Sequence, residues 1–427
     1  MPKRTWLGSM NGKRLALLLV LCVASHAVAT TGFDEAIDDA VRGSISTTGD
    51  VADAVGGVIQ DSVSAVQVNL HRVRAELEEL AFRYNTSVPS WEARAAEVRL
   101  GILQGAGLDP LPVRQRLDRR IHSKKFKNGY TIENVALEIS PGYWLSGNLY
   151  RPLGRTGKVP AIAHPIGHFK KDGWLTRTQP EMQVRAGHLA QMGAVVFAYD
   201  MVGWGETRQV PHSSKRALAL QLWNTMRSID FLESLPEVDP GRIAIVGASA
   251  GGTQAILAAA VDPRIAVSVP VVKVSALTAG GCTCETGMPI RSRTGTNNAE
   301  IAALIAPKPL LIVTDGEDET KHFPELEYPY VQGIYRLYGA EDRFRNVHLA
   351  DEGHDFGINK RKAVYDFLAE HLGLDRIPIA NDGRSRYPEN VSIEHSASLE
   401  AWTPTEGGGP GEWFVLLPDA PVPGWVY

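Results

Sequence analysis

The 427-residue chain has few cysteines and no excess of charge of either sign. Three cysteines in this length exclude a small fold built on disulfides, and 44% hydrophobic residues are enough for a core without disulfides or metals. The 44 Lys and Arg residues nearly balance the 48 Asp and Glu residues, so charge gives no indication of a nucleic-acid partner. The composition predicts an ordinary globular protein with one large domain and additions, or two average domains.

Long apolar runs are also absent after the first thirty residues. LALLLVLCVA (15–24) follows basic residues at 3, 4, 13 and 14 and precedes Ala27-Val28-Ala29, as in a secretory signal peptide. Residues 1–29 therefore predict export, to the periplasm or the medium; the alternative is an uncleaved membrane anchor. Because the run is too short to span a bilayer, no stable membrane span is expected after processing. Leu21 is bulky where a lipoprotein site needs a small residue, so lipidation is not expected.

Removal of that segment leaves two cysteines, Cys282 and Cys284. Exported proteins often pair their cysteines, but a bridge across a single intervening residue would be strained. A tight local disulfide and two buried free thiols both fit the sequence.

The region before residue 126 is divided into a lead-in and a helical extension. Residues 31–57 are rich in Gly, Ser, Thr, Asp and Ala, and we expect them to be flexible. Apolar residues from Ile59 to Tyr84 recur in steps of three and four, which predicts a helix with one apolar stripe. The stripe either packs on the body of the protein, which we favour, or mediates self-association. A second helix is expected over 91–108.

From residue 129 the pattern changes to that of a sheet. YTIENVALEIS and YWLSGNLYRP alternate like two antiparallel strands joined at Pro141-Gly142. Buried apolar runs then alternate with helical segments as far as residue 374, which predicts an α/β fold with a doubly wound, mostly parallel sheet. We expect the catalytic domain over 126–379. Residues 380–427 contain GGGPG and PDAPVPG and predict a loop-rich appendage with one short strand, EWFVLL.

Gly247-Ala248-Ser249-Ala250-Gly251 has the G-x-S-x-G pattern, between a buried strand and a helical run. This is the context of a nucleophile elbow, in which glycines allow strand and helix to approach and the turn projects the serine hydroxyl. A phosphate-binding loop is the alternative, but no Lys-Ser/Thr pair follows the glycines. The pattern favours Ser249 as a nucleophile.

An activated serine needs a base and an acid that orients the base, in the chain order Ser, Asp or Glu, His. The acidic run 315–319 follows one predicted strand, and Asp318 comes after a glycine, from which its side chain can turn inward; Asp315 is the second candidate. His354 lies between glycines after the last predicted strand. The order therefore predicts Ser249, Asp318 and His354 as the catalytic residues.

The oxyanion of an acyl-transfer intermediate needs backbone N–H donors. Ala250 follows the nucleophile and supplies one, and Ile166, Gly167 or His168 in HPIGHF supplies the other, because Pro165 has no N–H; Ile166 and Gly167 are favoured. His164 and His168 have the spacing of a helical metal pair, but the intervening proline and glycine argue against a helix. No metal and no cofactor are expected.

With these motifs in place, the chain resembles the α/β-hydrolase superfamily, in the secreted bacterial branch of acetyl xylan esterases, cephalosporin-C deacetylases and dienelactone hydrolases. The resemblance runs from about residue 91 to residue 374, through HPIGHF, YDMVGWGET, VDPGRIAIVGASAGGTQ, GGCTCE and DEGHDFG. It implies a Ser-Asp-His triad at the three residues above. It also places a substrate pocket beside His168, Trp204, Cys284 and Glu285. His-Pro replaces the His-Gly of many relatives at the oxyanion segment.

The resulting hypothesis is an exported serine carboxylester hydrolase that acts through an acyl-enzyme. The resemblance favours acetyl groups on a polysaccharide as the substrate, with glucuronoyl or other esters as alternatives. A peptidase of the prolyl oligopeptidase kind shares the elbow and the triad order, but the segment before the catalytic region is short and helical, with no room for a propeller. A non-catalytic binding module on the same fold is a third interpretation.

Overall fold

The computed structural model describes residues 69–168, 176–278, 282–286, 294–379 and 387–402. The predicted signal peptide, the lead-in, residues 59–68 of the apolar stripe and the segment EWFVLL lie outside these ranges. Residues 69–84 are helical, as the stripe predicts. Within the described ranges, no helix has the length and apolar character needed to cross a membrane.

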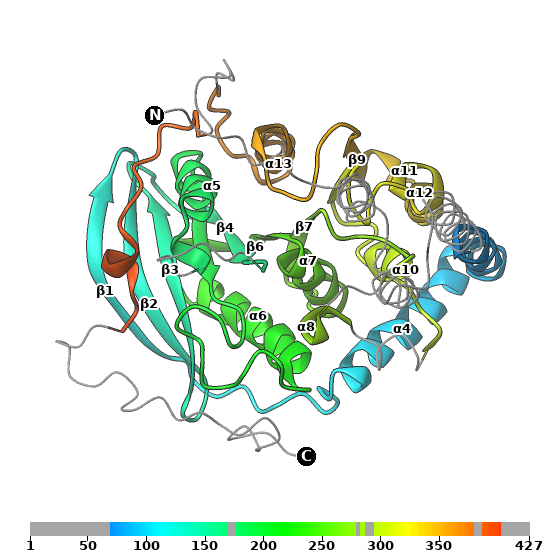
Figure 1. The fold of residues 1–427 in the computed structure, drawn as a ribbon, viewed down its shortest axis with the longest axis horizontal. Coiled ribbons are helices and arrows are strands. Elements are labelled where there is room, and N and C mark those ends of the chain that lie inside the picture. Colours follow the sequence, from blue (N-terminus) through cyan, green and yellow to red (C-terminus); the bar gives the residue numbers. More distant parts are fainter. Residues whose placement is uncertain (1–68, 169–175, 279–281, 287–293, 380–386, 403–427) are drawn as a thin grey trace, which may run out of the picture. The chain divides into compact units, whose positions relative to one another are not determined.

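A single nine-stranded sheet forms the centre of the catalytic region, in the order β1-β2-β3-β5-β4-β6-β7-β8-β9. β1 to β3 are antiparallel, β3 pairs antiparallel with β5, and the strands from β5 to β9 are parallel. The prediction of a doubly wound, mostly parallel α/β sheet is therefore confirmed (Figure 1). The strands are β1 Asp118–Lys127, β2 Tyr130–Ser140, β3 Tyr143–Pro152, β4 Val159–Pro165, β5 Val195–Tyr199, β6 Val238–Ala248, β7 Ile265–Val271, β8 Leu310–Asp315 and β9 Phe344–Leu349.

The sequence predicts two antiparallel strands at the start of the sheet, and the structure has three. The additional strand, β1, reads DRRIHSKKFK and lies at the edge of the sheet, with most of its side chains exposed or half-buried. Charged residues are common on edge strands because they discourage pairing with another sheet. The same charges hide the apolar alternation by which a strand is recognised in a sequence.

Helices cover both faces of the sheet (Figure 1). Helices α5 and α13 pack on one face, while α6 and α7 contact each other on the opposite face, where α7 also contacts α4 and α10. The helices are α4 Val88–Gly105, α5 Pro180–Gln191, α6 Ala217–Glu233, α7 Ala250–Val261, α8 Thr283–Thr286, α10 Asn298–Ala303, α11 Phe323–Leu326, α12 Tyr328–Leu337 and α13 Ile358–Leu372. The helix predicted at residues 91–108 corresponds to α4, and α5, α6 and α13 are among the helical segments expected between the apolar runs.

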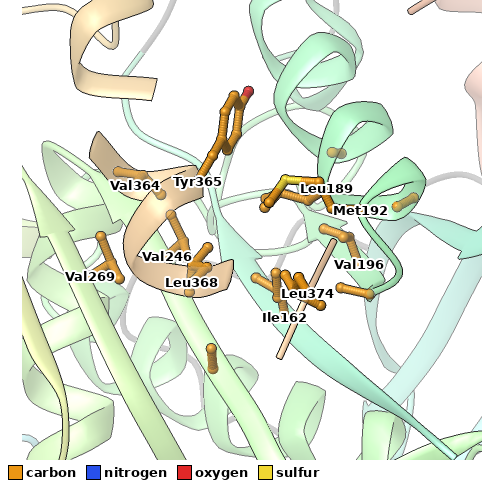
Figure 2. Close-up of a cluster of buried hydrophobic side chains, with 14 of the residues drawn as sticks. Ile162, Leu189, Met192, Val196, Val246, Val269, Val364, Tyr365, Leu368 and Leu374 are labelled. Carbon is orange, nitrogen blue, oxygen red and sulfur yellow. The ribbon is translucent and has the colours of Figure 1, made fainter. Parts of the chain in front are cut away.

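The core under α5 and α13 is built from the continuous apolar runs of the central strands. Figure 2 shows Ile162, Val246 and Val269 of β4, β6 and β7 in one cluster with Leu189 of α5 and Leu368 of α13. Each fully buried side chain of this size contributes about 1.5–3 kcal/mol to folding. The core holds the parallel strands in place, so their carboxyl ends form a rigid edge for the loops that follow.

Part of the region after residue 380 packs on the sheet. The carbonyl of Leu399 accepts hydrogen bonds from Asn148 of β3 at 2.9 Å and from Arg177 at 3.0 Å. Arg177 is fully buried and is ion-paired with Asp200 and Glu206, which lie after β5. This network therefore fixes the loop after β5, which contributes to the site.

Candidate active site

Ser249 lies at the turn between β6 and α7, with φ 55° and ψ −124°. A positive φ is strained for a residue with a side chain, and it is the conformation of a nucleophile elbow. The Ser249 N–H donates to the carbonyl of Val271 at 3.0 Å, which holds the turn against β7. A Cβ on Gly247 would lie 2.2 Å from the Gly251 carbonyl oxygen, and one on Gly251 would lie 2.5 Å from that of Pro165. The two glycines of the motif are therefore required by close backbone contacts.

His354 and Asp318 form a hydrogen-bonded pair. His354 Nδ1 lies 2.7 Å from Asp318 Oδ2, and since a carboxylate only accepts, Nδ1 carries the proton. The hydrogen bond to Asp318 raises the pKa of His354 against the opposing effect of burial. Burial tends to raise the pKa of Asp318, but its hydrogen bonds with His354 and Thr320 lower that pKa below the usual range. Asp318 is thus held as an anion that orients the imidazole and leaves Nε2 with a lone pair.

Asp315, the second candidate for the acid, has a different partner. Its Oδ2 lies 3.3 Å from Nζ of the buried Lys360, which is in the first turn of helix α13. Burial and the neighbouring Asp318 raise the pKa of Asp315 to about 6. Lys360 also donates to the carbonyl of Gly353 at 2.6 Å and to Asp355 at 2.9 Å, on either side of His354. Lys360, which the sequence analysis missed, therefore ties the histidine loop to the end of β8.

The loop after β4 lies beside the N-terminus of α7, because the Pro165 carbonyl approaches Gly251 closely. Ile166 and Ala250, two of the predicted oxyanion donors, belong to one buried cluster that also contains Cys284. Gly167 is the next residue in the same loop. The geometry thus brings the backbone of both predicted donor segments to one place.

His164 is separate from this loop. Its Nδ1 donates to the Val246 carbonyl at 2.7 Å, and Nε2 accepts from Arg185 at 3.3 Å. Burial and the charge of Arg185 lower the pKa of His164 to about 3. His164 is therefore a neutral core residue, and it does not pair with His168.

His168 is surrounded by the other predicted pocket residues. Its ring meets Trp204 edge-on at 5.5 Å between centroids, its Nε2 lies 3.3 Å from Cys284 Sγ, and its Nδ1 lies 3.9 Å from Glu285 Oε2. Burial lowers the pKa of His168 against the carboxylate of Glu285, which raises it, and positive charge on His212, Lys273 and His354 lowers it further. The pocket residues therefore lie within electrostatic reach of the candidate base. The structure brings together all four pocket residues that the resemblance implied.

Cys282 and Cys284 are both free thiols, as in the second of the two alternatives left open, although Cys282 is half-buried rather than buried. Cys284 is buried, and burial raises the pKa of its thiol. His212, from the loop before α6, lies 3.1 Å from Cys282 Sγ. Sequence reasoning missed His212, because a single histidine in a loop carries no spacing signal.

Lys273 is a second charged residue that sequence reasoning missed. It follows β7, is buried, and its Nζ lies 3.1 Å from Glu285 Oε1 and 3.0 Å from Glu319 Oε1. Glu319 adjoins Asp318, so Lys273 links the pocket loop to the loop of the candidate acid. The arrangement as a whole can position a nucleophile, a base and N–H donors around a carbonyl group.

Comparisons with known proteins agree with this chemistry. A family described as glucuronyl esterase, fungi, matches residues 210–289. The solved structure of methylesterase BT1017 is 40% identical, with a TM-score of 0.69, over 78% of this chain and 73% of that one. The 4-O-methyl-glucuronoyl methylesterase 1 of Wolfiporia cocos is 28% identical over 50% of this chain and 59% of its own length.

A glucuronoyl esterase from Solibacter usitatus shares the fold, with 17% identity and a TM-score of 0.51 over 67% of this chain and 94% of that one. The extent and identity of the match to methylesterase BT1017 are sufficient to assign the family. The chain belongs to the α/β-hydrolase superfamily, among its carboxylic ester hydrolases.

Proposed function

We propose that the protein hydrolyses carboxylic esters of a polysaccharide with Ser249, His354 and Asp318 as its catalytic triad. The observation that carries the proposal is the arrangement at the carboxyl edge of the sheet. Ser249 occupies a strained elbow after β6, and His354 is oriented by a buried carboxylate after β8. These are the parts that an acyl-enzyme mechanism needs.

In the first half-reaction, His354 Nε2 accepts the Ser249 proton as Oγ attacks the ester carbonyl. The hydrogen bond from Nδ1 to Asp318 favours the imidazolium that forms, as the direction of the His354 pKa shift indicates. The backbone N–H groups of Ala250 and of Ile166 or Gly167 stabilise the tetrahedral oxyanion. The imidazolium then protonates the leaving alcohol, and the acyl group remains on Ser249.

The second half-reaction reverses these roles with water. His354 takes a proton from water, the hydroxide attacks the acyl-enzyme, and the collapse of the second tetrahedral intermediate returns the proton to Ser249 Oγ. The products are a carboxylic acid and an alcohol. No group beyond the residues named is needed for either step.

For the substrate, we favour the methyl ester of a uronic acid within a polysaccharide. The support is the similarity to methylesterase BT1017 and to a 4-O-methyl-glucuronoyl methylesterase. Acetyl groups on a polysaccharide, which the sequence resemblance favours, are the second candidate. In a uronate methyl ester the sugar supplies the carboxyl group, so hydrolysis releases methanol. In an acetylated sugar the sugar supplies the hydroxyl group, so hydrolysis releases acetate.

The products therefore decide between the candidates. Purified protein is incubated with methyl-esterified pectin, with glucuronoxylan esters and with acetylated xylan, and methanol and acetate are measured in each. We expect methanol release from a uronate ester and none from the Ser249→Ala protein. Acetate release alone would select the acetyl esterase. Hydrolysis of peptide amides without hydrolysis of any ester would instead support the prolyl oligopeptidase alternative.

A polysaccharide substrate is consistent with export, and we propose that residues 1–29 are a cleaved signal peptide. The N-terminus of the secreted protein, measured by sequencing the protein from the periplasm or medium, tests this. We expect it to begin just after Ala29.

A further inference from the structure

Four metal-binding side chains converge beside the candidate active site: His168, His212, Cys282 and Cys284. One ligand atom from each lies within 4.8 Å of all the others. They come from three separate segments, namely the loop after β4, the loop before α6, and α8 with the residue preceding it. We infer that these four side chains bind one zinc ion.

The distances fit a tetrahedral site. With Zn–N of about 2.05 Å and Zn–S of about 2.3 Å, neighbouring ligand atoms lie about 3.3–3.8 Å apart. The Nε2 atoms of the two histidines are 2.9 Å apart, His212 Nε2 is 3.1 Å from Cys282 Sγ, and His168 Nε2 is 3.3 Å from Cys284 Sγ. An outward shift of a few tenths of an ångström brings these atoms to the spacing of a zinc-centred tetrahedron.

The hydrogen bonds of the histidines also favour a cation between them. His212 Nδ1 lies 2.7 Å from the Val202 carbonyl, which only accepts, so that nitrogen carries the proton and Nε2 has a lone pair. His168 Nδ1 lies 3.9 Å from Glu285 Oε2, which is beyond hydrogen-bond distance, and binding of a metal at its Nε2 requires the tautomer with the proton on Nδ1. In that tautomer both Nε2 lone pairs, 2.9 Å apart, are turned to one place, where a shared metal ion would accept them. Orientation of a ligating histidine by a second acceptor is the usual outer contact at zinc sites.

The ligand set indicates a structural role for the metal. Two thiolates and two imidazoles close the coordination of Zn²⁺, whereas catalytic zinc sites keep a position open for water. The two thiolate charges cancel the charge of the ion, so a partly buried site carries no net charge. Sulfur and nitrogen ligands in a tetrahedral arrangement select zinc over magnesium or calcium.

The zinc would join the three loops that border the pocket. His168 follows Ile166 and Gly167 directly, and Cys284 packs with Ile166 and Ala250 in one cluster. If these residues donate to the oxyanion, a point that rests on the proposed function, the metal holds the donor loop in position. The triad itself contains no metal ligand.

Metal content tests the site independently of any activity. The full chain is produced with zinc in the medium, purified without chelators and analysed by inductively coupled plasma mass spectrometry. We expect about one zinc per chain, falling at least about fivefold in the Cys284→Ser and His212→Asn proteins. His371→Asn, in the last turn of α13, is the matched control and should retain the zinc.

A spectroscopic measurement on the wild-type chain covers the case in which a variant fails to fold. Zinc is removed with a chelator and replaced by Co²⁺, which gives strong visible bands in a tetrahedral site and a charge-transfer band when thiolates are bound. Both bands are expected. Three results would each overturn the inference. The purified chain could contain no metal, or the metal could remain after the cysteine and histidine substitutions. The intact mass could also be lower by two hydrogens, which would show a Cys282–Cys284 disulfide. Zinc without ester hydrolysis would refute the proposed function alone.

Discussion

Replacement of Asp318 by asparagine tests the electrostatic part of the mechanism. The Asp318 side chain is 6% exposed, and its Oδ2 accepts from His354 Nδ1 at 2.7 Å. A hydrogen bond to a buried charge contributes about 1.5–3 kcal/mol. An asparagine NH₂ group facing Nδ1 also favours the tautomer whose Nε2 carries the proton and cannot accept from Ser249. The two effects together predict a decrease of about 10³–10⁴-fold in kcat/KM, or about 4–5.5 kcal/mol in transition-state stabilisation.

The assay is the initial rate of hydrolysis of a short-chain aryl ester across a range of pH. Asp315→Asn is the matched control, because Asp315 lies three residues away but faces Lys360 rather than His354. We expect the control to retain kcat/KM within about tenfold of wild type, since its carboxyl pKa of about 6 already allows a neutral form near pH 6. The reasoning is refuted if Asp318→Asn keeps kcat/KM within about threefold of wild type, or if Asp315→Asn loses as much as Asp318→Asn.

Three further predictions follow from the contacts of the site. Because Asp318 raises the pKa of His354, kcat/KM should fall as pH decreases through a value above the pKa of a free imidazole, and a pH–rate profile measures this. The stability contributed by this pair is full below the pKa of His354 in the unfolded chain and should be lost as pH rises through its pKa in the folded chain, which urea unfolding at several pH values measures. An acid limb of the pH–rate profile at or below the free-imidazole pKa would contradict the assignment. Gly251→Ala places a Cβ 2.5 Å from the Pro165 carbonyl oxygen and should lower the free energy of unfolding, measured in urea, by about 1–3 kcal/mol. In the control Gly333→Ala, the Cβ meets only a flexible side chain, so the decrease should be smaller. Equal decreases would argue against a backbone clash at Gly251. Lys360→Met leaves the buried carboxylate of Asp315 without its cation and should destabilise the fold by about 3–5 kcal/mol. It should also lower kcat by loosening the His354 loop, and Lys360→Arg should partly rescue both stability and kcat. A change in stability without any change in kcat would show that Lys360 does not position the loop.

The sequence predicts well those parts of the site that depend on local order along the chain. The Ser249 elbow can be recognised in the sequence because its three parts, an apolar strand, a run of small residues and a helical segment, each have a distinct composition. A loop residue after a glycine can turn inward, which favours Asp318 over Asp315, and the structure pairs Asp318 with His354. Strand order then brings the loops after β6, β8 and β9 to one edge of the sheet.

Parts that depend on distant contacts were not predictable in the same way. His212 is 44 residues from His168 and 70 from Cys282, so no spacing motif connects the four side chains. His164 and His168 have the spacing of a helical metal pair in the sequence, but they contact different partners in the structure. Lys360 lies in INKRK, which has the composition of an exposed helix start, and only the packing of α13 against β8 shows that it is buried.

The central claim is that Ser249 is a nucleophile activated by His354. Labelling with a fluorophosphonate probe, followed by peptide mass spectrometry, tests this directly because the probe forms a stable adduct only with an activated serine. The account predicts one adduct, on Ser249, that is abolished in Ser249→Ala and strongly reduced in His354→Gln. An unlabelled wild-type chain, or an adduct on another residue that persists in Ser249→Ala, would contradict it.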